Sequence, residues 1–89
     1  MKTIYKYNLG TSSKHIMLPI GSKILTAQNQ SDKIVLWALI DPNEQRQIQF
    51  SIMVILTGSL IEDEEDYILH YISTVQIHEI VYHIFEVME

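Results

Sequence analysis

Apolar and polar residues alternate with a period of two over most of this chain. Successive side chains of a β-strand point to opposite faces, so this alternation predicts strands that bury one face. Clusters of Gly, Pro, Asn, Asp and Ser separate the alternating stretches and predict turns. The pattern therefore predicts seven strands, over residues 2–8, 15–18, 23–30, 34–40, 46–56, 67–77 and 80–87.

One stretch breaks the alternation. Residues Ile34–Ile40 are seven consecutive apolar residues, and they include the only tryptophan, Trp37. A short apolar run between two polar turns is typical of a strand that is buried on both faces. The run is too short to cross a bilayer, which takes about 20 apolar residues. We therefore expect this strand to be central, with Trp37 in the core.

No stretch has a helical spacing of apolar residues that lasts longer than about one turn. We therefore predict an all-β protein, a small antiparallel sandwich or partly open barrel of about seven strands. A chain of this size buries only about 60 to 65% of its unfolded surface, which is enough for one core. Residues 1–89 are accordingly expected to form a single domain, with a loop or a short helical turn at residues 60–66.

Charge is distributed unevenly along the chain. Residues 1–40 contain five lysines and one acidic residue, whereas residues 41–89 contain one arginine and ten acidic residues. The net charge of −5 disfavours binding to duplex DNA, which requires neutralisation of phosphates. A local group of lysines can still bind a small anion. Half of the later acidic residues follow one another in a predicted loop, Glu62, Asp63, Glu64, Glu65 and Asp66.

Several blocks of this sequence match a known pattern in the same order along nearly the whole chain. They are Lys2–Tyr7, Leu18-Pro19 with Gly21 and Lys23–Leu25, Gln28, Leu36–Pro42, Thr57-Gly58, Ile61-Glu62 and His83–Glu86. In these blocks the chain resembles a family of small, uncharacterised proteins encoded by tailed phages and prophages. It departs from that pattern at Leu56, where we expect a glycine before Thr57-Gly58. The resemblance implies a phage origin and the host cytoplasm, but no reaction.

The sequence offers little support for catalysis or metal binding. It has no cysteine, and its four histidines lack the short spacings typical of metal sites. His83 alternates with Val81 and Phe85, so we expect it to be a half-buried structural residue. The serines in the predicted turns lack the context of a nucleophile. We predict no metal, no cofactor and no enzymatic activity.

Basic and aromatic residues are better candidates for function. Small β domains hold nucleotides by stacking bases on aromatic rings and by pairing phosphates with Lys or Arg. Lys6, Lys23 and Arg46 are the expected phosphate contacts, because the other lysines lie near turns or near the first residue. Thr57 and Gly58 are expected to add a hydroxyl and a backbone N–H. The alternative for these residues is structural, with Trp37 in the core and the lysines protecting strand edges from aggregation.

Three hypotheses of function follow. The first is a non-enzymatic phage counter-defence protein that sequesters a small signalling nucleotide at a homo-oligomer interface. The second is an inhibitor similar to anti-CRISPR proteins, whose acidic loop Glu62–Asp66 binds a host defence protein by charge mimicry. The third is an accessory phage protein without a ligand. Homo-oligomerisation is expected because strands 46–56 and 67–77 have apolar residues on both faces. Residues 1–10 lack the apolar stretch of a signal peptide, in keeping with a location in the host cytoplasm.

Overall fold

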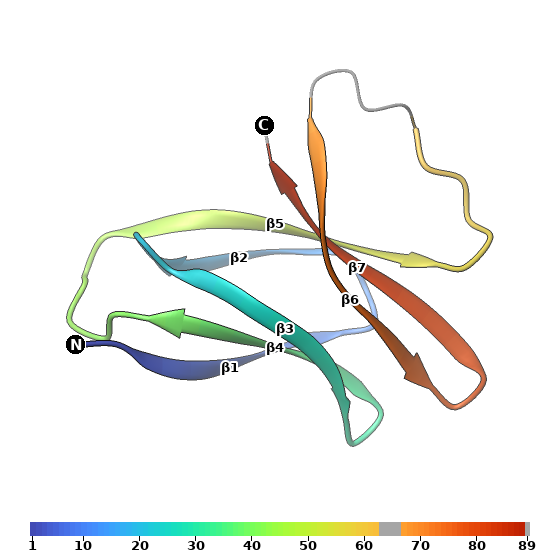
Figure 1. The fold of residues 1–89 in the computed structure, drawn as a ribbon, viewed down its shortest axis with the longest axis horizontal. Helices are drawn as coiled ribbons and strands as arrows, with labels where there is room; N and C mark the ends of the chain where they lie inside the picture. The colour runs from blue at the N-terminus through green and yellow to red at the C-terminus, as the bar shows by residue number, and fades with distance from the viewer. Residues whose placement is uncertain (63–66, 89) are drawn as a thin grey trace.

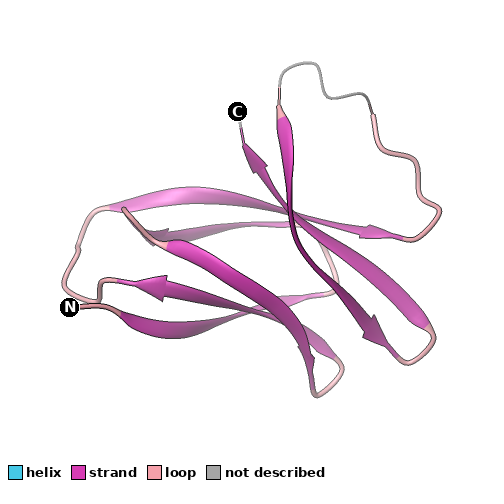
Figure 2. Cartoon of the chain, in the orientation of Figure 1, coloured by secondary structure: helices cyan, strands magenta, loops and turns pink. Residues whose placement is uncertain are grey.

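The fold is seen in a computed structural model, which describes residues 1–62 and 67–88 (Figure 1). These residues contain strands, turns and loops but no helix (Figure 2), so none of them forms a helix able to cross a membrane. The described residues form seven strands: β1 (Thr3–Gly10), β2 (Lys14–Pro19), β3 (Lys23–Gln30), β4 (Lys33–Ile40), β5 (Gln47–Leu56), β6 (Ile68–Ile77) and β7 (Ile80–Met88). The predicted all-β class is confirmed, and each predicted strand end lies within two residues of the observed one. Of the possible helical turn, residues 60–62 are not helical and residues 63–66 lie outside the described part.

The strands form two antiparallel sheets, one with the order β1-β4-β3 and the other with the order β2-β5-β7-β6. The two sheets pack on one another as an open sandwich and do not close into a barrel. The apolar run in β4 is the central strand of the three-stranded sheet, as its composition predicted. The start of β6 and the end of β7 project beyond the three-stranded sheet, at the top of Figure 1.

The core lies between the inner faces of the two sheets. Even-numbered residues of β4 are almost fully buried, with Leu36 and Ala38 at 0% exposure. From the other sheet they meet side chains of β5, β6 and β7, and the largest of these that are fully buried are Ile52 and Ile84. A smaller group, Leu18, Ala38 and Ile40, continues the core toward β2.

The two sheets also meet along one side, where the edge strands β3 and β6 are neighbours. The Ser73 hydroxyl oxygen accepts a hydrogen bond from the Ala27 amide at 2.9 Å and lies 2.8 Å from the Thr26 hydroxyl. Farther along, the Asn29 side-chain amide donates to the Gln76 carbonyl at 3.1 Å. Side-chain hydrogen bonds therefore join the two sheets at these edges.

The turn between β3 and β4 has the geometry that a tight hairpin requires. Ser31 and Asp32 have φ angles of 53° and 63°, which matches the twist of the two flanking strands. The Asp32 carboxylate lies 3.1 Å from His78 Nε2 in the turn between β6 and β7. The tips of the two hairpins, at the lower right of Figure 1, are therefore in contact.

Three strands contain an irregularity that changes which residues share a face. Register shifts occur between Asn8 and Gly10 in β1, between Ile24 and Thr26 in β3, and between Tyr71 and Ser73 in β6. One extra residue at such a bulge exchanges the two faces of the strand. Strict alternation placed Ile24 and Ala27 on opposite faces, which was wrong, because both pack into the core.

The outer face of the four-stranded sheet is mainly apolar. In the register of β5, β6 and β7 with their neighbours, the side chains on this face alternate with those in the core. We call it the uncharged face, because none of the outward positions in its described strands is Lys, Arg, Asp or Glu. Its central residues are Ser51, Met53, Ile55, Leu69, Tyr71, Thr74, Val81, His83, Phe85 and Val87.

Candidate nucleotide-binding face

The outer face of the three-stranded sheet brings lysines together around Trp37. Directly opposite residues of an antiparallel pair point to the same side of the sheet. Lys6 of β1 is opposite Trp37, Lys23 of β3 is opposite Leu39, and Lys33 precedes Trp37 by four residues on β4. Because the even-numbered residues of β4 fill the core, these odd-numbered residues face outward. We call this surface, formed by Lys6, Lys23, Lys33, Trp37 and Leu39, the basic face.

Trp37 is half-buried on this outer surface, and the expectation that it lies in the core was wrong. The physical reason is that Trp37 is an odd-numbered residue of β4, whereas the even-numbered residues point into the core. The inward positions on either side of Trp37 belong to Leu36 and Ala38, which leaves the indole on the side away from the second sheet. An indole that is partly open to solvent is available for stacking.

Lys6 already has one partner on the same surface. Its ammonium group donates to the Gln30 side-chain oxygen at 2.7 Å, and this bond crosses β4 because β4 lies between β1 and β3. Val35, the outward residue before Trp37, is only 3% exposed. Of these two outward residues, Val35 is therefore buried, and Trp37 is the one that is partly exposed.

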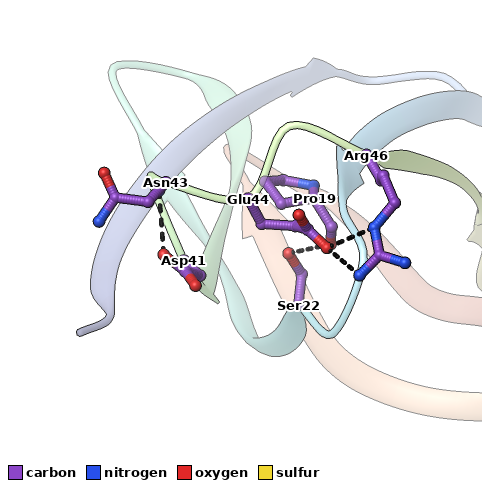
Figure 3. Close-up of polar contacts among 6 residues, drawn as sticks. All are labelled: Pro19, Ser22, Asp41, Asn43, Glu44 and Arg46. Carbon is purple, nitrogen blue, oxygen red and sulfur yellow. Dashed lines mark hydrogen bonds and ion pairs between the residues drawn. The ribbon is translucent and has the colours of Figure 1, made fainter.

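Arg46, one of the predicted phosphate contacts, is paired with an acidic residue in the loop before β5. Its Nε and Nη2 donate to a single carboxylate oxygen of Glu44, at 2.9 and 2.6 Å (Figure 3). The hydrogen bonds from Arg46 lower the pKa of Glu44, and those same bonds raise the pKa of Arg46. Arg46 therefore has a neutralising partner, whereas within residues 1–62 and 67–88 the lysines of the basic face form no ion pair.

Thr57 and Gly58 lie at the opposite end of β5 from Arg46, on the order of 30 Å away at about 3.3 Å per residue. The Thr57 hydroxyl lies 2.6 Å from His83 Nε2, on the other sheet from the basic face. Gly58 has a φ of 89°, which explains a glycine in this turn without any ligand. The five residues predicted to share one site are thus divided among three places, and only Lys6 and Lys23 lie on one face.

A hollow of about 400 Å³ opens beside Lys23. It lies between the start of β3, the first half of β6 and the end of β7. Phe50 lines its apolar side, and His70 and Glu86 line its polar side. A carboxylate in the hollow disfavours a phosphate there, because like charges repel at short range. The anionic part of a ligand therefore fits the basic face better than the hollow.

The histidines and the acidic run do not form a metal site in the described part of the chain. No group of three or more His, Cys, Asp or Glu side chains there is close enough to hold a metal ion. His83 is half-buried and hydrogen-bonded, as expected. Of the acidic run, Glu62 is exposed, and the residues from Asp63 to Asp66 lie outside the described part.

Comparison with known proteins places the whole sequence in one family. The model of a family described as a domain of unknown function (DUF7352) matches residues 1–89. The chain belongs to this DUF7352 family. No curated protein and no solved structure matches it. The DUF7352 description states neither a source nor an activity, so the phage origin implied by the resemblance stays a prediction.

From the sequence, Lys33 and Gln30 were not expected on this surface, and Trp37 was considered for base stacking but placed in the core. A signal for them was present, because Lys33, Val35, Trp37 and Leu39 are spaced two apart. In a run that is apolar on both sides, however, the pattern does not say which parity faces the second sheet. The packing of the even-numbered residues of β4 against the second sheet decides it.

Proposed function

We propose that this protein is a non-enzymatic binding module that holds a small nucleotide against the basic face. One observation supports the proposal most strongly: Lys6 lies directly opposite Trp37, and Lys23 lies opposite the next outward residue of the same strand. Trp37 would stack on the base, and the two ammonium groups would pair with the phosphates. Flat sheet faces with an aromatic ring and flanking cations bind bases and phosphates in this way.

The charge distribution favours a small ligand over a long nucleic acid. The lysines of the basic face are local, whereas the protein as a whole has a net charge of −5. A polymer that extends beyond the basic face would meet the acidic remainder of the surface. A ligand with one or two bases would contact only Trp37 and the lysines.

The biological setting we propose is phage counter-defence, in which the protein sequesters a nucleotide immune signal in the host cytoplasm. This part rests on the resemblance of blocks such as Lys2–Tyr7 and Leu36–Pro42 to phage proteins. The sequence suggested a ligand at a homo-oligomer interface, whereas we propose that the half-buried, outward-facing Trp37 binds a ligand on a single copy.

The test is a titration of Trp37 fluorescence with linear and cyclic nucleotides, followed by calorimetry of variants. Lys6→Ala and Lys23→Ala should each weaken binding about tenfold to a hundredfold, because a charge-assisted hydrogen bond contributes about 1.5 to 3 kcal/mol. Trp37→Phe should retain binding. Lys14→Ala is the matched control, since Lys14 lies on β2 of the other sheet. Arg46→Ala should have little effect, because Arg46 is paired with Glu44.

Two results would reject the nucleotide proposal: no nucleotide changes the fluorescence of Trp37, or the Lys6 and Lys23 variants bind as tightly as Lys14→Ala. An inhibitor that uses the acidic run would instead bind a host protein and lose that binding when Glu62 and its acidic neighbours are replaced. An accessory protein without a ligand would show neither behaviour.

A further inference from the structure

The uncharged face and the basic face differ in a way that points to different roles. The basic face exposes lysines, whereas the outward positions of β5, β6 and β7 contain no Lys, Arg, Asp or Glu among the described residues. Met53, Ile55, Phe85 and Val87 are half-buried at its centre, and Tyr71 is 56% exposed. An apolar area of this kind, on a small and otherwise charged protein, marks a contact surface.

The polar groups on this face already have partners within the chain. His83 Nε2 lies 2.6 Å from the Thr57 hydroxyl, and His83 Nδ1 lies 3.2 Å from the Thr74 hydroxyl. The Tyr71 hydroxyl continues this chain, 2.8 Å from Thr74. Burying hydrogen-bonded polar groups costs much less than burying unpaired ones. The face can therefore be covered by another apolar surface without leaving these groups unsatisfied.

We propose that the uncharged face is the contact between two copies of this chain. In a twofold dimer the same surface patch meets itself, so it must be self-complementary. A face without charged side chains meets this condition, because no like charges oppose one another. Two copies with a net charge of −5 each would repel across most other surfaces.

The size and arrangement of the face also fit a dimer. Four strands span roughly 15 to 20 Å across and, over eight or nine residues, roughly 25 to 30 Å along. That flat area is on the order of 400 to 600 Å² per copy, near the lower end of the roughly 600 to 1,000 Å² per partner of specific interfaces. Apolar residues lie on the central strands β5 and β7, with Gln49 and Gln76 nearer the rim. An apolar centre within a polar rim is the usual anatomy of an interface.

This inference does not rest on the proposed function. The basic face is the outer surface of the opposite layer of the sandwich, so nucleotide binding and dimerisation can succeed or fail separately. The mass of the protein is measured without nucleotide, whereas nucleotide binding is measured at Trp37.

The first experiment is sedimentation of the full chain over a range of concentrations. The wild type should have twice the monomer mass of 10.4 kDa. Tyr71→Glu should dissociate the dimer at least tenfold more readily, because dimer formation would bury an unpaired charge in an apolar contact. Ile4→Glu is the matched control: Ile4 is 53% exposed on the other sheet and should leave the mass unchanged. Circular dichroism of both variants checks that they remain folded.

A second measurement needs no substitution. In a mixture of isotope-labelled and unlabelled wild-type protein, filtered NMR spectra should show contacts between copies at Met53 and Val87 and none at Lys23. The proposal is overturned if the wild type sediments as a monomer at all concentrations, as it would if a different protein covers this face. It is also overturned if folded Tyr71→Glu stays dimeric, or if the contacts between copies involve the basic face.

Discussion

The Ser73 hydroxyl accepts a hydrogen bond from the Ala27 amide at 2.9 Å, which connects the edge of one sheet to the edge of the other. Ala27 is 3% exposed, so its amide has no access to water as a substitute partner. Ser73→Ala should therefore lower the free energy of unfolding by about 1 to 3 kcal/mol, the cost of an unpaired buried donor. Urea denaturation measures this loss.

The control for Ser73 is Ser12→Ala in the exposed turn between β1 and β2. A surface substitution away from any contact should change stability by less than about 0.5 kcal/mol. Equal midpoints for the two variants would contradict a structural role for the contact between β3 and β6.

Neighbouring residues of β4 should respond differently to truncation. Leu36 is fully buried, and Leu36→Ala should cost about 2 to 5 kcal/mol. Trp37 is partly exposed, so Trp37→Ala should cost less than the about 3 to 5 kcal/mol typical of a fully buried tryptophan. Chemical denaturation of the two variants gives the order directly. A larger loss for Trp37 than for Leu36 would place the indole in the core after all.

Gly58 has a backbone role that can be separated from ligand binding. Its φ of 89° is strained for other residues, although nothing lies within 4 Å of the position that a Cβ would take. Gly58→Ala should therefore destabilise the fold by about 1 to 2 kcal/mol through backbone strain alone. Gly58→Asn should cost less, since asparagine tolerates positive φ better. Thermal unfolding compares the two, and a neutral Gly58→Ala would contradict the turn geometry.

The pair formed by Glu44 and Arg46 should be visible in a pH titration. The hydrogen bonds from Arg46 lower the pKa of Glu44 below its ordinary value of 4.5. The ionised form is thus favoured by folding, so its small stabilising effect is present above the ordinary pKa and is lost as the pH falls through the lowered pKa. Carboxylate NMR should show this difference as a midpoint for Glu44 that lies below 4.5. Arg46→Gln should remove that difference, and an unchanged midpoint would show that the pair does not form in solution.

Most strands could be predicted from the sequence because one face is buried and the other faces solvent. This produces the alternation of apolar and polar residues. Residues 23–30, for example, gave the observed limits of β3. The bulge at Leu25 could not be predicted, because an extra residue in an alternating stretch looks the same as a normal one. The outward position of Trp37 was hidden for a different reason, since its neighbours on both sides are apolar.

The candidate site was predicted only in part, because it is assembled by strands distant in sequence. Lys6 and Lys23 were both singled out from the sequence, but the surface that they share depends on β4 lying between β1 and β3. Arg46 was chosen for its forked guanidinium, and the sequence did not reveal that Glu44, two residues earlier, would bind it. Thr57 and Gly58 were included for their turn chemistry, and they form the turn that follows β5.

The bulge at Leu25 has a consequence for how the DUF7352 family can diverge. Lys23 precedes the bulge and Gln28 follows it, and both lie on the same outer face. The number of residues in β3 therefore determines which side chains point to the core. Deleting one residue there would move the core side chains of one half of the strand to the outer face, and the outer side chains to the core. Substitutions can accumulate in β3, but insertions and deletions are tolerated only in loops such as residues 41–46. Family members that keep the basic face should therefore have a β3 of constant length and connections of variable length.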